Sequence, residues 1–166
     1  RSRLEQAHRD GIVDVIPDGV GEAFRDCDIV FLCTPVEYNA QYLAQVRPFL
    51  KPGSFLTDVG STKTDIHRSV TALGMEDIFV GGHPMAGSEK TGYEASTDHL
   101  LENAYYIITP TASSPAQYVE RLTEIARMIG AIPIVLDYRE HDRITAAISH
   151  LPHIIASSLV NLVKAS

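Results

Sequence analysis

Short apolar runs alternate with amphipathic stretches along most of this chain, and this alternation constrains the fold more than any other feature. The clearest run, residues 28–33, is almost continuously apolar, as in strands buried on both faces of a sheet. Further strands are predicted over 54–58, 78–81, 105–109 and 132–136, and helices over 37–49, from Ser61 or Thr62 to about Leu73, and over 115–129. Strands and helices in this order predict an α/β fold around a mostly parallel, doubly wound sheet.

A long apolar helix is predicted from about Glu140 to the end of the sequence. Its segment 144–163 is apolar on most faces, and such a helix requires a partner surface to cover it. The chain starts at Arg1 and the apolar pattern continues to the last residues without a stop signal. We therefore expect a piece of a longer protein.

Composition excludes several classes of protein. The 166 residues, 45% of them hydrophobic, suffice for one packed core and exclude a disordered or fibrous chain. A net charge of −7, with no Lys/Arg cluster longer than a pair, excludes a nucleic-acid binder. Cys27 and Cys33 lie in apolar stretches and are expected to be buried, reduced thiols of a cytoplasmic protein. Neither a signal peptide nor a membrane span is recognised.

Three strand ends are candidates for a ligand site, because ligands of open α/β sheets bind beyond the carboxyl ends of the strands. They are Cys33-Thr34-Pro35, Asp58-Val-Gly60-Ser61 and Gly81-Gly82-His83-Pro84. The dense glycines around His83 favour a general acid or base over a histidine that only stabilises a turn. Ser61 precedes a helix, where it either meets a polar ligand or simply caps the helix.

The segment Ser149-His150-Leu-Pro-His153 interrupts the long apolar helix with polar side chains. The spacing places His150 and His153 on one helix face, and Pro152 is expected to kink the helix. We interpret the cluster as the wall of a pocket; alternatively, the histidines are hydrogen-bonded within a core or an interface. We expect no metal, because a zinc site needs three or four ligands and neither cysteine is suitably placed. Gly19-Val-Gly21 lacks the context of a dinucleotide loop and is expected to be an ordinary loop.

Three segments together resemble the prephenate/arogenate dehydrogenase family of tyrosine biosynthesis. They are Gly82-His-Pro-Met-Ala-Gly-Ser-Glu89, Asp58-Val-Gly-Ser-Thr-Lys63 and Ser149-His-Leu-Pro-His153, and the resemblance spans essentially the whole chain. It implies a partial Rossmann-type NAD(P)-binding domain over 1–138 and, over 139–166, the start of a helical domain for substrate binding and homodimer formation. The first β-α-β unit is expected before residue 1, and a substrate-binding arginine beyond Ser166.

The resemblance also implies roles for individual residues. His83 matches the catalytic histidine, and Ser61 matches a serine between that histidine, the substrate hydroxyl and the nicotinamide. Cofactor contacts are implied for Cys33, Thr34, Pro35, Asp58, Gly60 and Ser61. Substrate contacts are implied for Ser61, His83, Ser88, Glu89, Ser149, His150 and His153.

The activity implied is NAD-dependent oxidative decarboxylation of prephenate to 4-hydroxyphenylpyruvate in the cytoplasm, by a homodimer without nucleic-acid or membrane partners. Arogenate as the substrate, giving tyrosine, and NADP as the cofactor stay open. A non-catalytic α/β dimerisation or regulatory module is the alternative from another class. A 3-hydroxyacid or 6-phosphogluconate type dehydrogenase is disfavoured, because it would leave the His83 motif without a role.

Overall fold

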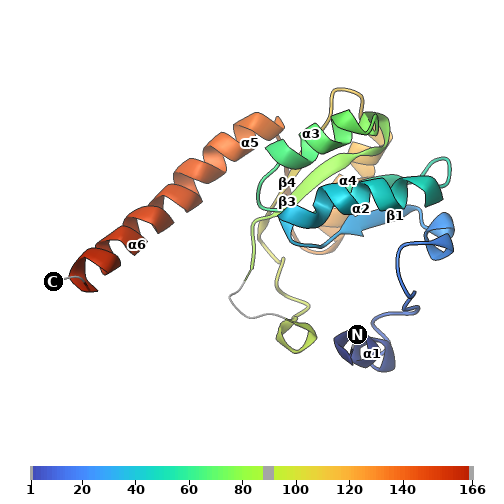
Figure 1. The fold of residues 1–166 in the computed structure, drawn as a ribbon, viewed down its shortest axis with the longest axis horizontal. Coiled ribbons are helices and arrows are strands. Elements are labelled where there is room, and N and C mark those ends of the chain that lie inside the picture. Colours follow the sequence, from blue (N-terminus) through green and yellow to red (C-terminus); the bar gives the residue numbers. More distant parts are fainter. Residues whose placement is uncertain (1, 88–91, 165–166) are drawn as a thin grey trace.

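The computed structural model describes residues 2–87 and 92–164 and contains five strands and six α-helices within them. Ser88 and Glu89, implied substrate contacts, lie outside the described residues. The strands are β1 Ile29–Leu32, β2 Phe55–Asp58, β3 Val80–Pro84, β4 Tyr105–Pro110 and β5 Ile132–Val135. The helices are α1 Ser2–Arg9, α2 Asn39–Val46, α3 Thr64–Ala72, α4 Ala116–Met128, α5 Tyr138–Thr145 and α6 Leu151–Lys164 (Figure 1). All five predicted strands and the helices between them are confirmed, whereas the sequence analysis missed α1.

The strands follow one another across the sheet, and their pairing is mostly parallel, as predicted. β1 pairs parallel with β2, a parallel bridge between Leu56 and Phe79 joins β2 to the start of β3, and β5 pairs parallel with β4. β3 and β4 are antiparallel. Parallel neighbours need a crossover connection, which is usually a helix, whereas the described residues between β3 and β4 contain only the 3-10 helix Tyr93–Ala95. Because β1, β2 and β3 run parallel to one another, their carboxyl ends share one edge of the sheet.

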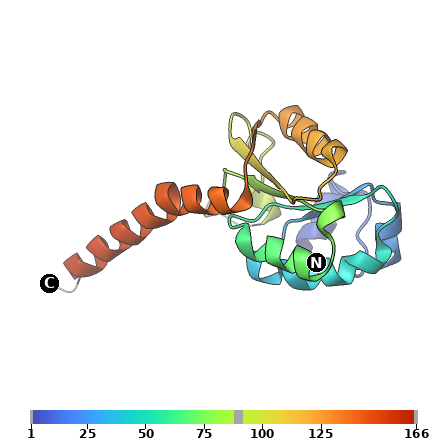
Figure 2. The ribbon, with the colours of Figure 1, turned by 90° about the horizontal axis from the view of Figure 1, so that it is seen from above.

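Helices cover the two faces of the sheet (Figure 2). α2 and α3 pack on one face over a cluster that includes Val30, Leu32 and Leu56. α4 packs on the other face over a cluster that includes Val80 and Ile108. Successive strand residues point to opposite faces of the sheet, so a strand contributes apolar side chains to both clusters only if it is apolar throughout. This requirement explains the continuous apolar runs in the sequence.

The N-terminus of α3 is capped from a distant part of the chain. The sequence predicts a cap at Ser61 or Thr62, but neither residue caps the helix, which starts at Thr64. Instead, the carboxylate of Asp142 accepts hydrogen bonds from the backbone N–H groups of Lys63 and Thr64, both at 2.8 Å. Asp142 lies in α5. The predicted cap was wrong because a carboxylate 78 residues further along the sequence occupies the place of a local hydroxyl.

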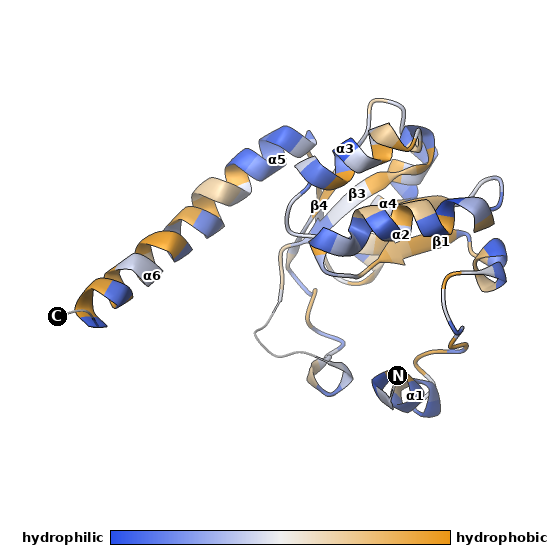
Figure 3. Ribbon diagram, viewed as in Figure 1, coloured by the Kyte–Doolittle hydropathy of each residue, from blue (hydrophilic) through white to orange (hydrophobic). Residues whose placement is uncertain are grey.

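The last helix is continuous from Tyr138 to Lys164 and leaves the α/β domain as a long arm (Figures 1 and 3). A π-helical segment, Ala146–His150, ends two residues before Pro152, and the N–H of Leu151 donates to the carbonyl of Ala146. The expected kink at Pro152 thus takes the form of a wider turn. By length and apolar composition alone this helix could cross a membrane, which the sequence analysis did not recognise.

The cysteines differ from the expectation. Cys27 is only partly buried and Cys33 is exposed. β1 pairs only with β2 among the described residues, so one edge of this strand is open and Phe31 is 39% exposed. The apolar run in the sequence indicates burial on both faces, but it carries no information about whether the strand lies at an edge.

Gly82 supplies a test of the packing around β3. A Cβ atom on this residue would lie 2.6 Å from the carbonyl oxygen of Asp58 and 3.0 Å from the hydroxyl of Tyr106. Gly82→Ala should lower the free energy of unfolding by about 1–3 kcal/mol, the usual cost of overpacking. Gly19→Ala is the matched control, because nothing lies within 4 Å of its Cβ position. Equal denaturation midpoints for both variants would contradict the close packing at Gly82.

Candidate active site

The three predicted strand ends meet at one edge of the sheet. The loop after β2 touches the loop after β1: a Cβ on Gly60 would lie 3.0 Å from Val36 and 3.7 Å from the side chain of Asn39. Asn39 in turn accepts a hydrogen bond of 2.7 Å from the hydroxyl of Thr34. Close packing at Gly60 leaves no room for a side chain. The segments 33–35 and 58–61 therefore lie side by side at one edge of the sheet.

A buried ion pair underlies this edge. Asp58 and Lys63 are both fully buried, and the ammonium of Lys63 donates to the carboxylate of Asp58 and, at 2.6 Å, to the carbonyl of Gly82. The same carboxylate accepts from the backbone N–H of Gly60 at 2.9 Å and of Gly82 at 3.2 Å. Burial lowers the pKa of Lys63, and the neighbouring Asp58 opposes that shift. Asp58 thus holds β2, β3 and the start of α3 together from below the surface.

His83 lies in β3 and contacts a second buried histidine. Its Nδ1 is 2.8 Å from Nε2 of His141 in α5, and Nδ1 of His141 is 2.8 Å from the carboxylate of Asp142 in the same helix. The hydroxyl of Thr145 lies 3.4 Å from Nε2 of His141. Burial lowers the pKa of His83 to about 4, and His141 and Lys63 act in the same direction. His83 is therefore a neutral imidazole at neutral pH.

A pocket of about 280 Å³ opens beside His83. It is lined from the sheet side by Ser61, His83 and residues 84–87, and from the helical arm by Thr145, Ser149 and His150. The structure therefore brings together the predicted catalytic pair and part of the predicted substrate helix. His153 lies beyond His150 in α6, is exposed and is not among the lining residues.

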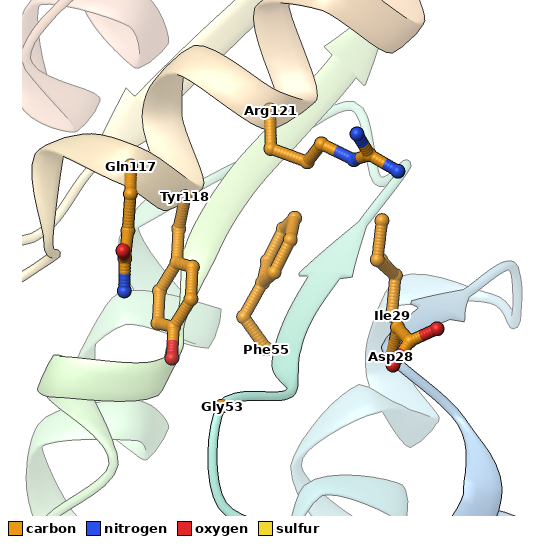
Figure 4. A pocket seen from close by; sticks show the side chains of 7 residues that line it. All are labelled: Asp28, Ile29, Gly53, Phe55, Gln117, Tyr118 and Arg121. Atoms are coloured by element: carbon orange, nitrogen blue, oxygen red, sulfur yellow. The ribbon is translucent and has the colours of Figure 1, made fainter.

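A different hollow, of about 450 Å³, lies at the opposite end of the strands (Figure 4). Asp28, Ile29, Gly53 and Phe55 from the starts of β1 and β2 line it together with Gln117, Tyr118 and Arg121 of α4. The rings of Phe55 and Tyr118 stack there at 4.8 Å. Ligands of α/β sheets bind at the carboxyl ends of strands, and the amino ends meet here. We therefore place the active site at the His83 pocket.

The sequence analysis missed His141, Asp142 and Lys63. A signal for the first was present: His141, Thr145 and Ser149 recur at intervals of four and so share one face of a helix. A polar face leading to the predicted pocket residue Ser149 would have drawn attention to His141. No comparable pattern marks Lys63, whose burial depends on the packing of two strands and a helix. Within the described residues, no group of three His, Cys, Asp or Glu side chains is arranged to hold a metal ion.

Comparison with known proteins identifies the family of this chain. Residues 1–135 match the family described as prephenate dehydrogenase, nucleotide-binding domain, and residues 137–166 match prephenate dehydrogenase, dimerization domain. The chain belongs to the prephenate dehydrogenase family.

Individual relatives cover most of this chain. It is 40% identical over 157 residues to the prephenate dehydrogenase of Lactococcus lactis, and 37% identical over 153 residues to that of Bacillus subtilis. These alignments cover 93% and 91% of this chain but only 42% and 41% of the relatives. The chain thus spans about two-fifths of the length of these enzymes.

Solved structures share the fold. A crystal structure of Synechocystis arogenate dehydrogenase matches 98% of this chain and 57% of its own with a TM-score of 0.89 and 30% identity. The prephenate dehydrogenase of Aquifex aeolicus in complex with hydroxyphenyl propionate and NAD+ matches 96% of this chain and 56% of its own, with a TM-score of 0.87 and 29% identity. The predicted Rossmann-type α/β fold that continues into a long helix is confirmed.

Replacing Lys63 tests the buried pair. Lys63→Met removes the ammonium but keeps a similar volume, so Asp58 becomes an unpaired buried charge and the free energy of unfolding should fall by about 3–5 kcal/mol. Adding Asp58→Asn should recover part of the loss, because no uncompensated charge then remains. Lys51→Met is the control: Lys51 pairs with the exposed Asp28 at 2.8 Å, and its loss should cost below about 1 kcal/mol. A double variant no more stable than Lys63→Met would refute this account.

Proposed function

We propose that this chain is the catalytic core of a prephenate dehydrogenase, which oxidatively decarboxylates prephenate to 4-hydroxyphenylpyruvate with NAD. The observation that carries the proposal is the single pocket in which Ser61, the neutral His83, Ser149 and His150 meet. These side chains come from three segments far apart in the sequence. A non-catalytic module would have no need of a buried, uncharged histidine beside such a pocket.

His83 acts as the general base. As hydride leaves the ring carbon that bears the hydroxyl, this C–O bond gains carbonyl character and its proton becomes acidic. A neutral imidazole takes this proton and thereby assists the departure of the hydride. The ring carboxylate then leaves as carbon dioxide, the ring becomes aromatic, and the proton returns from His83 to the phenol oxygen. No proton is gained or lost overall.

Ser61 lies between the cofactor-binding loops and His83 in this proposal. It lines the pocket just after the end of β2, which suits a hydroxyl that orients the substrate hydroxyl toward the imidazole. Ser149 and His150 on the opposite wall offer hydrogen bonds to carboxylate oxygens of the substrate. In this proposal Ser61, Ser149 and His150 thus act on the substrate from two sides of one pocket.

The adjoining loops 33–35 and 58–61 are the part of this edge that would hold a nicotinamide cofactor. Nδ2 of Asn39, beside Gly60, is a buried donor for which no protein partner is found in the described part of the chain. Thr34, Pro35 and Gly60 would hold the cofactor, which when bound accepts the hydride. Asp58 lies beneath this surface with its carboxylate engaged by Lys63, so we assign it to support of the loop.

We propose a homodimer in the cytoplasm as the working form. α6 has no buried residue among those described, and exposed Leu159, Leu162 and Val163 require cover. A second copy is favoured over a lipid bilayer, because Ser, His and Asn side chains recur along the helix and are costly in lipid. The net charge of −7 disfavours nucleic acid.

Substrate and cofactor can be determined in one assay. Reduced cofactor should form when the full-length enzyme receives prephenate and NAD, with lower rates for arogenate or NADP. His83→Asn should lower kcat by a factor on the order of 10² to 10⁴, as expected for loss of a general base. A folded dimer that is inactive with prephenate and with arogenate, each tested with NAD and with NADP, would favour the non-catalytic alternative. Near-normal turnover of His83→Asn would exclude the mechanism.

The two histidines of the substrate helix should differ in their effects. His150 lines the pocket whereas His153 does not, although the motif assigns both to substrate binding. His150→Ala should raise KM for prephenate about tenfold, roughly the loss of one charge-assisted hydrogen bond. His153→Ala should raise KM for prephenate less than His150→Ala does, because His153 does not line the pocket of its own subunit. A larger effect of His153→Ala would mean that further parts of the protein bring this side chain to the substrate.

A further inference from the structure

The contact between His83 and His141 restricts where their hydrogens lie. Nδ1 of His83 and Nε2 of His141 are 2.8 Å apart, so one nitrogen donates a hydrogen and the other accepts it. His141 is 1% exposed and His83 is 8% exposed, so water cannot easily substitute for either partner. Which nitrogen donates is decided by the group on the far side of His141, the carboxylate of Asp142.

Asp142 is held as an ionised acceptor. Its oxygens accept from the backbone N–H groups of Lys63 and Thr64, from the hydroxyl of Thr64 at 2.5 Å and from Nδ1 of His141. Partial burial raises the pKa of Asp142, but these hydrogen bonds outweigh burial and leave the pKa below its ordinary value. A carboxylate can only accept. Nδ1 of His141 must therefore carry a hydrogen.

The remaining choice follows from charge. With both histidines neutral, Nε2 of His141 has no hydrogen and accepts from Nδ1–H of His83, so the lone pair of His83 is on Nε2. The reverse direction requires a doubly protonated His141. His141 is 1% exposed, and burial disfavours an additional positive charge there. The hydroxyl of Thr145 can donate to the same Nε2 of His141 and is compatible with the neutral state.

We propose that His141 and Asp142 are positioning residues that hold His83 as the Nδ1–H tautomer and store the substrate proton during turnover. The proposal rests on the proposed function. When the substrate hydroxyl gives its proton to Nε2 of His83, the hydrogen on Nδ1 moves to Nε2 of His141. His141 then carries the positive charge beside the carboxylate of Asp142. The reverse shifts return the proton to the product oxygen, so the steps balance without an external acid or base.

The arrangement also connects the proton path to the loop that carries Ser61. Oδ1 of Asp142 accepts from both His141 and the N–H of Lys63, two residues after Ser61. One carboxylate thus fixes the orientation of His141 and the start of α3. Ser61 and His83 keep their relative positions because both depend on the same anchor in α5.

Nuclear magnetic resonance of the full-length protein tests the tautomer without substrate. In protein labelled with [15N]histidine, the His83 signals are assigned by their absence in His83→Asn. The expected result near neutral pH is a protonated Nδ1 and an unprotonated Nε2 for His83. A protonated Nε2 on His83 would overturn the proposal.

Two substitutions of His141 separate orientation from proton storage. The amide oxygen of His141→Gln can accept from Nδ1–H of His83, so the tautomer should persist, but the amide cannot store a proton and kcat should fall about tenfold. His141→Leu can do neither, so the tautomer preference should be lost and kcat should fall about 100-fold, the range seen for partners that orient a functional histidine. KM should change less than about twofold in both.

Asp137→Asn is the matched control on the same helix. The side chain of Asp137 caps α5 through the N–H groups of Arg139 and Glu140. Its backbone carbonyl accepts from the N–H of His141 at 2.9 Å, and asparagine keeps this carbonyl. Its substitution should leave the tautomer and kcat unchanged. Equal kcat for His141→Leu and wild type would refute the relay. Inactivity of the wild type toward prephenate and arogenate would instead refute the proposed function, and the tautomer would still decide the positioning role.

Discussion

The buried carboxylate of Asp58 connects the three segments from which the active-site edge is built. It receives the ammonium of Lys63 and the backbone N–H groups of Gly60 and Gly82. A fully buried charge is tolerated only when its acceptor positions are filled, so each donor must stay in place for the others to be stable. The end of β2, the start of α3 and the middle of β3 are thereby fixed relative to one another, and with them Ser61 and His83.

A second carboxylate, Asp142, attaches the helical arm to this edge. It caps α3 from α5 and at the same time accepts from His141, which contacts His83. The pocket wall formed by Ser149 and His150 lies further along the same arm. His83 and the helical arm are therefore joined by one short path of hydrogen bonds. The candidate site depends on the junction of the two parts of the chain that match separate domains of the prephenate dehydrogenase family.

Features that leave a local pattern in the sequence were predicted correctly, whereas features that depend on distant contacts were not. Strands were identified because a strand covered by helices on both faces must be apolar throughout, and this leaves a direct pattern. The exposure of Cys33 was not identified, because an open strand edge has the same composition as a paired one. The cap of α3 was assigned to the nearest hydroxyl, whereas a distant carboxylate with two acceptor oxygens takes that place. Local patterns cannot reveal a partner that only the folded chain brings near.

The sequence by itself determined the α/β class, the sheet edge that holds the candidate site, and the candidates Ser61, His83, Ser149 and His150, because strand ends, glycines and helix spacing are local properties. Only the tertiary structure decided which of these side chains share a pocket, that Asp58 lies beneath it and that His153 lies outside its lining. It alone revealed the contact of His83 with His141, 58 residues away in sequence. Hydrogen bonds between distant segments depend on three-dimensional packing, which no spacing along the chain encodes directly.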